Sequence, residues 1–252
     1  MIYVLLKKEL DSYFSSPLAY ILLALFSFVS GLIFFNLIVT YTDGIQSIPM
    51  GMAQNISFIQ EVVLKLFANI NFLFLFFIPL ITMRLFAEEK KVGTLDLFWL
   101  APISSVSLVV AKGLAALILV FVMLCLTLVF PVIIWGVGIH DFSSLFCDYL
   151  AVILNAASYI SLGLFFSTLS SNQLVAGLLS ILGIMVLWMI SWGGHLTSHY
   201  MFSEIFLYIG ITSHFEKILR GLISTSDLIY YVSFIFFFNF MTVKSLERRT
   251  WL

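Results

Sequence analysis

Charged residues are scarce in this chain. Asp, Glu, Lys and Arg make up 10% of its 252 residues, whereas soluble domains carry roughly 25%. A chain with so few charges cannot cover a water-facing surface, and no stretch is polar over a length that could form a soluble domain. A soluble enzyme or a soluble binding protein is therefore excluded, and most of the exterior must face lipid.

Cysteine is almost absent as well. Cys125 and Cys147 each lie in or beside an apolar run, which excludes a disulfide framework and favours ordinary buried side chains. A cleavable signal sequence is not expected at the N-terminus. The first apolar run, residues 17–39, is too long for such a signal, and no small-residue cleavage site follows it.

Motifs for catalysis and metal binding are also lacking. The chain has no glycine-rich phosphate loop ending in Lys-Ser/Thr, so it is not expected to hydrolyse ATP, and without His-Glu-x-x-His an intramembrane enzyme is disfavoured. His195 and His199 have the spacing of a helical metal pair, but Gly193 and Gly194 precede them, which favours loop histidines. We expect no catalytic residue, no metal site, no cofactor and no nucleic-acid partner in this chain.

Six apolar segments are present, and each is long enough to form a helix of about 20 residues that crosses the hydrocarbon layer. They lie at residues 17–39, 66–85, 108–137, 145–169, 174–192 and 228–243. Pro79 and Pro131 fall inside two of them and are predicted to kink the helices. The expected fold is all-α, with one polytopic transmembrane domain over residues 1–252.

Basic residues are unequally divided between the two sides of such a protein. One side has nine at or near the span ends: Lys7, Lys8, Arg84, Lys90, Lys91, Lys112, Lys244, Arg248 and Arg249. The other side has three: Lys65, Lys217 and Arg220. The positive-inside rule places the first side in the cytoplasm. Both termini are therefore predicted to be cytoplasmic, which also favours an even number of spans.

Residues 1–16 are amphipathic rather than uniformly apolar. One side of a helix here would carry Ile2, Leu6, Leu10, Tyr13 and Phe14, and the other Lys7, Lys8, Asp11 and Ser15. This pattern predicts a helix that lies in the membrane interface and ends at Pro17. A disordered polar N-terminus is the alternative.

The connection between the second and third spans, residues 86–107, contains a short apolar stretch. Gly93 breaks the preceding segment, Thr94 is a reasonable N-cap, and Pro102 ends a helix predicted at 95–101. This helix is too short to span, yet it would expose Leu95, Leu97, Phe98, Trp99 and Leu100. Such a surface must be buried on the membrane interface, on the protein's own helix ends or on a partner. The element can therefore transmit force between a soluble protein and two spans.

Three stretches resemble one known family. The sequence Glu88-Glu89-Lys90-Lys91-Val92-Gly93-Thr94-Leu95-Asp96-Leu97, followed by Ala101-Pro102-Ile103-Ser104, resembles the signature of type-2 ABC transporter permeases, with Asp96 in place of the usual Glu. Residues 7–17 are similar to the interfacial elbow helix of that family. Residues 214–231 are similar to the last outer segment of its gliding-motility (Gld-type) branch.

The resemblance implies a multi-pass protein of the bacterial cytoplasmic (inner) membrane that pairs with a second six-helix permease, as a homodimer or heterodimer. A dimer of separate ABC ATPase subunits, which hold ATP and Mg, would dock on the cytoplasmic side. The short helix of the 86–107 loop would be the coupling helix. By position, the ATPase contact would include Glu88, Glu89, Lys90, Lys91, Gly93, Thr94, Leu95, Asp96, Phe98 and Trp99.

The expected function is therefore that of the permease subunit of an ATP-driven export complex, whose substrate the sequence does not specify. An alternative is a mechanical transmitter. Such a subunit would relay ATPase motion to an extracytoplasmic partner without passing a substrate itself.

A short outer helix is predicted at 213–223. Ser213 and Glu216 have capping-box spacing, and apolar residues follow at i, i+3, i+4 and i+7: Phe215, Ile218, Leu219 and Leu222. In the family that the chain resembles, re-entrant helices at this place close an outer gate, which makes these four residues outer-gate candidates. A surface helix resting on the membrane is the alternative.

Polar residues inside the spans are few. Asn69, Asn71, Asn155 and Asn239 are expected to bond neighbouring helices, and small residues such as Gly163, Gly177 and Gly183 to allow close helix approach. No charged residue is expected in the middle of a span, which disfavours a proton- or ion-coupled carrier.

Overall fold

Six helices of this chain are long and apolar enough to cross a membrane. The computed structural model describes residues 2–46, 59–94, 104–136, 142–196 and 200–248, and within these ranges the chain forms helices and no strand. The six candidate spans are Pro17–Gly44, Val62–Val92, Ser105–Trp135, Ser144–Leu169, Gln173–Gly194 and Thr225–Glu247. The predicted all-α, multi-pass architecture is confirmed, and the helices extend several residues beyond the apolar runs.

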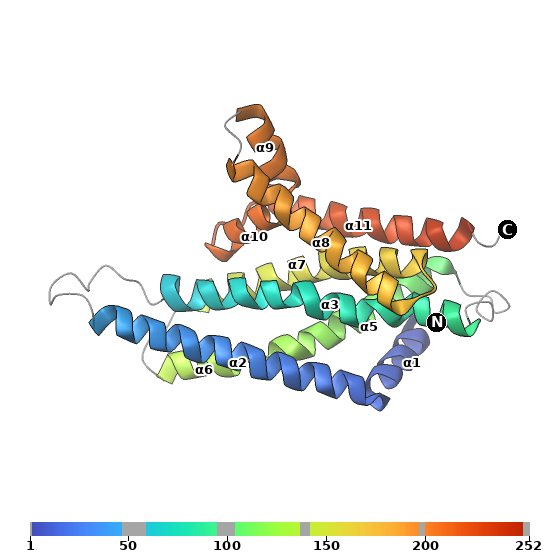
Figure 1. The fold of residues 1–252 in the computed structure, drawn as a ribbon, viewed down its shortest axis with the longest axis horizontal. Coiled ribbons are helices and arrows are strands. Elements are labelled where there is room, and N and C mark those ends of the chain that lie inside the picture. Colours follow the sequence, from blue (N-terminus) through green and yellow to red (C-terminus); the bar gives the residue numbers. More distant parts are fainter. Residues whose placement is uncertain (1, 47–58, 95–103, 137–141, 197–199, 249–252) are drawn as a thin grey trace.

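The helices form an elongated bundle (Figure 1). Their bounds are α1 (Ile2–Ser15), α2 (Pro17–Gln46), a π-helical turn at Ile59–Leu64, α3 (Lys65–Val92), α5 (Ser105–Thr127), α6 (Val129–Gly136), α7 (Phe142–Leu169), α8 (Gln173–Leu196), α9 (Tyr200–Ile209), α10 (Ile211–Leu219) and α11 (Thr225–Glu247). Helix α1 lies at one end of the bundle, together with the last turns of α3 and α11, and α9 and α10 lie at the other. We refer to these as the α1 end and the α10 end.

Helices α3 and α7 form the centre of the bundle. Helix α7 packs against α3, α5, α8, α10 and α11. In the most apolar window of each span, 61% of the residues are buried in α3 and 67% in α7, but only 17% in α2, 28% in α8 and 22% in α11. The outer faces of α2, α8 and α11 are thus broad and apolar, which suits contact with lipid or with another membrane chain.

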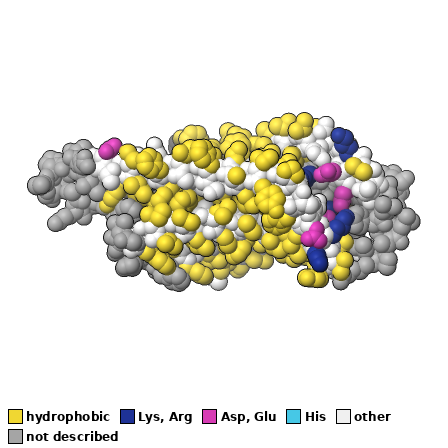
Figure 2. All heavy atoms as spheres, turned by 90° about the horizontal axis from the view of Figure 1, so that it is seen from below, with side chains coloured by type: hydrophobic (Ala, Val, Ile, Leu, Met, Phe, Trp, Pro, Cys, Tyr) yellow, Lys and Arg dark blue, Asp and Glu magenta, His cyan; other side chains and the backbone are white. Residues whose placement is uncertain are grey.

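Charge and apolar surface are separated along the bundle. Figure 2 shows hydrophobic side chains over most of its length and acidic and basic side chains gathered at the α1 end. Helix α1 is present as predicted, and α2 begins directly at Pro17. The buried side of α1, however, carries Leu5 and Tyr13, while Ile2 is exposed.

Small and polar residues hold α3 and α7 close together. A Cβ atom added to Gly163 would lie 2.9 Å from Cβ of Thr82, and one added to Gly183 would overlap Phe166. Between α3 and α7, the Asn155 amide donates to Asn71 Oδ1. The predicted helix-packing role is confirmed for Gly163 between α3 and α7, for Gly183 between α7 and α8, and for Asn71 and Asn155, whereas Asn69 donates to the Lys65 carbonyl within α3 and does not bond a neighbouring helix.

Pro131 interrupts the third span as predicted. Helix α5 ends at Thr127, four residues before this proline, and α6 starts at Val129. Proline has no N–H for the Thr127 carbonyl, and its ring collides with that group. The Thr127 hydroxyl lies 3.1 Å from the Tyr149 hydroxyl of α7. At Pro79, by contrast, α3 remains one unbroken helix.

The outer helix differs from its prediction at both ends. Helix α10 runs from Ile211 to Leu219 after a glycine at position 210, so the predicted capping box is wrong. The Ser213 hydroxyl, expected to cap the helix, instead donates to the Gly210 carbonyl at 2.8 Å. Helix α10 ends before Gly221, whose φ of 78° is left-handed. The N–H groups of Gly221 and Leu222 bond the Ile218 and Lys217 carbonyls in a Schellman motif.

Gly193 and Gly194 do not end helix α8, contrary to the interpretation of the sequence. The helix continues to Leu196, and Gly194 allows a close approach of α9: an added Cβ would lie 2.9 Å from Cγ of Leu207. His195 is therefore in the last turn of α8, and His199 lies outside the described residues. Within the described part of the chain, no group of three or more His, Cys, Asp or Glu residues could hold a metal ion.

Candidate functional site

The predicted coupling residues divide into two groups. Glu88, Glu89, Lys90 and Lys91 form the last turn of α3, followed by Gly93 and Thr94. The 86–107 connection is thus helical up to Val92. Leu95, Asp96, Phe98 and Trp99 lie outside the described residues. The structure therefore shows how the two ends of the coupling segment are held.

Gly93 ends helix α3 in a left-handed conformation, with φ of 78°. The N–H groups of Gly93 and Thr94 bond the carbonyls of Lys90 and Glu89, at 3.3 and 3.0 Å. This Schellman motif satisfies carbonyls that would otherwise lack partners at the helix end. At the far side of the segment, Ser104 caps α5 by accepting from the Ser107 N–H at 3.2 Å. Both attachment points are therefore fixed by local hydrogen bonds.

A buried lysine joins the two helices that flank the segment. Lys112 of α5 is 1% exposed, and its Nζ lies 3.0 Å from Oε1 of Glu9 in α1 and 2.9 Å from Oε1 of Glu89 in α3. Lys8 lies 3.9 Å from the same Glu89 oxygen. We call these four residues the Lys112 cluster. Because buried charges separate only at high cost, the cluster makes α1, α3 and α5 one mechanical unit at this end.

Tyr13 adds a second link between α1 and α3. Its hydroxyl donates to the Ile81 carbonyl at 3.2 Å, and the Arg84 guanidinium lies 4.8 Å from its ring centre. Burial raises the pKa of the Tyr13 hydroxyl above its ordinary value, so the group remains a neutral donor. The Lys112 cluster, Tyr13 and Arg84 line a cleft of about 370 Å³.

Helices α7 and α11 are attached to the same end of α3. The Ser167 hydroxyl of α7 accepts from the N–H groups of Phe86 and Ala87, at 3.1 and 3.2 Å. The Lys90 ammonium bonds the Thr168 carbonyl, and the Thr168 hydroxyl bonds Ser245 of α11 at 3.0 Å. The α1 end of α3 is therefore linked to α1, α5, α7 and α11 by direct polar contacts.

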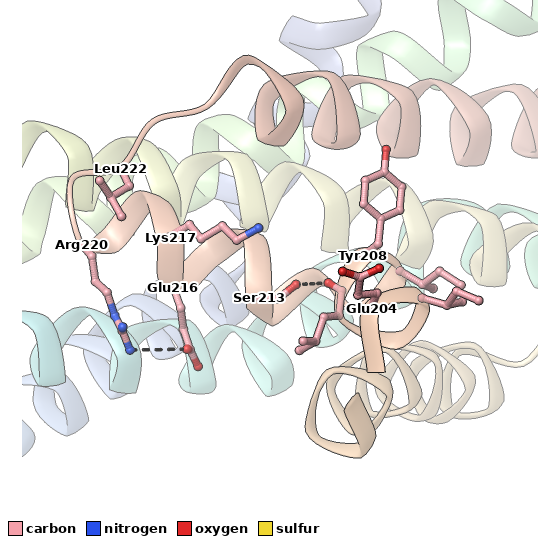
Figure 3. A pocket seen from close by; sticks show the side chains of 10 residues that line it. Glu204, Tyr208, Ser213, Glu216, Lys217, Arg220 and Leu222 are labelled. Atoms are coloured by element: carbon pink, nitrogen blue, oxygen red, sulfur yellow. Dashed lines mark hydrogen bonds and ion pairs between the residues drawn. The ribbon is translucent and has the colours of Figure 1, made fainter. Parts of the chain in front are cut away.

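The predicted outer-gate residues are only partly brought together. Phe215, Ile218 and Leu219 are buried where α10 packs on α7 and α8, whereas Leu222 lies beyond the helix and is 67% exposed. Figure 3 shows Leu222 on the wall of an open cavity of about 830 Å³ that α9 and α10 line. Tyr208, Ser213, Glu216 and Arg220 also line it. Leu222 therefore does not share the buried surface of the other three.

The sequence did not predict a buried histidine–aspartate contact at the α10 end. Nδ1 of His214 lies 2.6 Å from Oδ1 of Asp227, and the two side chains are 2% and 1% exposed. The other ring nitrogen, Nε2, lies 2.9 Å from the Tyr208 carbonyl. Tyr230 stacks on the imidazole with ring centres 4.0 Å apart. The pair joins α10 to the first turn of α11. Its two residues are thirteen positions apart, so no short sequence motif could have predicted the contact.

Comparison of this chain with protein-family models and with curated proteins finds no match. The function proposed below rests on the sequence of the α3–α5 connection and on the contacts that hold its two ends.

Proposed function

We propose that this chain is the transmembrane permease subunit of an ATP-driven export complex of the type-2 ABC class. The supporting observation is a combination of sequence and geometry. Residues 88–104 resemble the coupling segment of that class, and they connect two spans whose ends are joined through the Lys112 cluster. ATP and Mg would be held by separate ATPase subunits.

Coupling requires that motion of a docked ATPase reach the membrane helices. ATP binding closes an ATPase dimer, and a segment gripped by that dimer must move with it. A flexible attachment would dissipate this motion. Here the segment leaves α3 through the Schellman motif at Gly93 and enters α5 through the Ser104 cap. The Lys112 cluster then carries the displacement to α1.

The proposal includes a second six-helix permease as partner. Helices α2, α8 and α11 have exposed apolar faces that suit such a contact, including Phe28, Phe35, Leu178, Leu182, Trp192 and Phe236. The excess of basic residues at the α1 end favours a cytoplasmic location for that end. The complex would then lie in a bacterial cytoplasmic membrane, with its ATPase subunits on the α1 side.

The substitution Leu95→Asp tests the coupling contact. A carboxylate placed in an apolar docking groove would be desolvated without a partner, so ATPase recovery should fall at least about tenfold. The measurement is co-purification of tagged chain from its host membranes in mild detergent, with the ATPase identified by its P-loop sequence and by ATP hydrolysis. Leu222→Asp is the matched control, because Leu222 is exposed at the opposite end.

Gly93→Pro tests the attachment of the same segment. Proline fixes φ near −65° and has no N–H, so it removes the left-handed turn and the bond to the Lys90 carbonyl. We expect normal membrane insertion with loss of ATPase recovery. Unchanged ATPase recovery with Leu95→Asp, or an equal loss with Leu222→Asp, would contradict the proposal.

A further inference from the structure

Both ring nitrogens of His214 face hydrogen-bond acceptors. Nδ1 faces the Asp227 carboxylate and Nε2 faces the Tyr208 carbonyl. A neutral imidazole carries one N–H, so it can donate to one of these groups while its lone pair faces the other. Both contacts can be hydrogen bonds only if the pair carries one proton more than a neutral imidazole beside an ionised carboxylate. Either His214 is an imidazolium beside a carboxylate, or Asp227 is protonated and donates to Nδ1.

We propose that His214 and Asp227 form a proton-binding site that fastens α10 to α9 and α11, and that loss of the proton loosens α10. The ligand of this site is the proton itself. The inference goes beyond the proposed function and does not depend on an ATPase, because it concerns contacts within one chain at the α10 end.

Two helix ends favour the charge on His214. Asp227 lies in the first turn of α11, where the helix dipole stabilises an anion. The Tyr208 carbonyl belongs to the last turn of α9, where the dipole stabilises a cation. Asp227 Oδ2 is buried and has no hydrogen-bond partner among the described residues, so the carboxylate depends on His214 for its neutralisation. The imidazolium form fits both surroundings.

The rings that contact the imidazole are those of tyrosines, while Glu204, Glu216, Lys217 and Arg220 line the neighbouring open cavity and Asp148 of α7 is buried. Tyr208 of α9 and Tyr230 of α11 contact the imidazole, and Tyr231 interacts with Asp227 and with Tyr159 of α7. Helix α8 has no titratable residue except His195 near its end. In the described part of the chain, no Lys or Arg forms an ion pair with Asp227.

The bond to Tyr208 matters because α9 ends there. Side chains of α10 and α11 bond the last three carbonyls of α9: Ser213 that of Leu207, His214 that of Tyr208, and Tyr230 that of Ile209. These carbonyls have no partner within α9 itself. Without the His214 donor, the Tyr208 carbonyl loses its hydrogen bond, while the carbonyls on either side of it keep theirs. Tyr208 and Ser213, which take part in these hydrogen bonds, also line the open cavity of Figure 3.

The sign of the pH effect follows from the proton count. At low pH the pair holds its proton, and the His214 ring is hydrogen-bonded to both Asp227 and Tyr208. As the pH rises, the pair loses this proton and with it one of the two hydrogen bonds. Protection of the α10 backbone amides should therefore fall with increasing pH. At high pH, either the contact with Asp227 or the contact with Tyr208 must be given up.

Hydrogen–deuterium exchange on the full chain in phosphatidylcholine nanodiscs tests the proposal. After correction for intrinsic exchange rates, amides of residues 208–219 should be at least about tenfold better protected near about pH 5.5 than near about pH 8.5. Peptides from the middle of α3 provide the internal control. In Asp227→Asn, the Asn amide donates to Nδ1 and the neutral imidazole donates to Tyr208, so protection should be independent of pH.

A second measurement does not depend on the folding of that variant. The protein has four histidines. With His140, His195 and His199 replaced by Gln, nitrogen NMR of the remaining His214 should show both ring nitrogens protonated at low pH and one at high pH. An unprotonated Nδ1 at low pH would place the proton on Asp227, whereas ring-nitrogen signals that do not change between low and high pH would overturn the proposal. Wild-type amide protection that does not change with pH, or an Asp227→Asn variant with the wild-type pH dependence, would overturn it too.

Discussion

At the scale of single residues, two lysines of the α1 end differ in how deeply they are buried. Lys112 is 1% exposed and is held by two carboxylates, whereas the side chain of Lys244 is 57% exposed and pairs with Glu247 within its own helix. Removing one partner of a buried pair leaves an uncompensated charge, while an exposed pair contributes little. The two lysines should therefore respond very differently to substitution.

We predict that Lys112→Met destabilises the protein by on the order of 3 kcal/mol, because Glu9 and Glu89 would lose their buried cation. In a chain of this size, this corresponds to a fall of roughly 6 to 12 °C in Tm. Thermal melting of purified protein in detergent measures the change. Lys244→Met is the matched control and should melt within about 2 °C of the wild type.

The substitutions Glu9→Gln and Glu89→Gln, added to Lys112→Met, provide the complementary test. They remove the unpaired charges, so the triple variant should recover at least half of the lost Tm. A single Lys112→Met variant that melts like the wild type would show that the Lys112 cluster does not hold the three helices together.

The sequence predicted where each polar residue lies relative to the spans, but not which residue it contacts. The sequence marks Lys112 as a basic residue near a span end, but Glu9 is more than a hundred residues away, and only the fold brings them together. The same is true of His214 and Asp227. Asn71 and Asn155 were predictable as polar residues that must find partners within apolar spans, although the sequence does not say which ones.

At the scale of elements, the apolar runs predicted the spans, whereas the ends of helices depended on details that hydropathy does not contain. Helix α3 continues through charged residues to Gly93, where a left-handed glycine stops it. Helix α10 starts two residues before its expected N-cap, because Gly210 packs closely against Ser191. Tertiary contacts of this kind override local capping signals, which explains why the core of each element was predictable and its ends were not.

The α3–α7 interface gives a prediction at this scale. Gly163→Ala places a methyl group against Thr82 Cβ, at 2.9 Å, in the most buried part of the bundle. Overpacking of this kind costs about 1–3 kcal/mol, so Tm should fall. Gly31→Ala in α2 is the matched control: nothing lies within 4 Å of its added Cβ, and Ala is the better helix former. Melting curves in one detergent compare them, and a Gly163→Ala protein at or above the wild-type Tm would contradict this account.

At the scale of the whole molecule, charge and burial are arranged along different directions. On the face shown in Figure 2, charged side chains gather at the α1 end, whereas burial decreases outward from α3 and α7 to α2, α8 and α11. The first arrangement predicts which end faces the cytoplasm, and the second indicates which surfaces are left for lipid or a second chain. Both follow from the distribution of charged and apolar residues, which explains why the sequence could predict the architecture without identifying a substrate.

The orientation of the molecule is the last prediction. Both ends of the described chain lie at the α1 end, and the positive-inside rule places that end in the cytoplasm. In a chain with Cys125 and Cys147 replaced by Ser, single cysteines at Tyr3 and Leu222 provide reporters, because these positions are 74% and 67% exposed at opposite ends. A membrane-impermeant maleimide added to intact cells should label Leu222→Cys, and should label Tyr3→Cys only after permeabilisation. Equal labelling of Tyr3→Cys in intact and permeabilised cells would reverse the orientation, and with it the side on which an ATPase could dock.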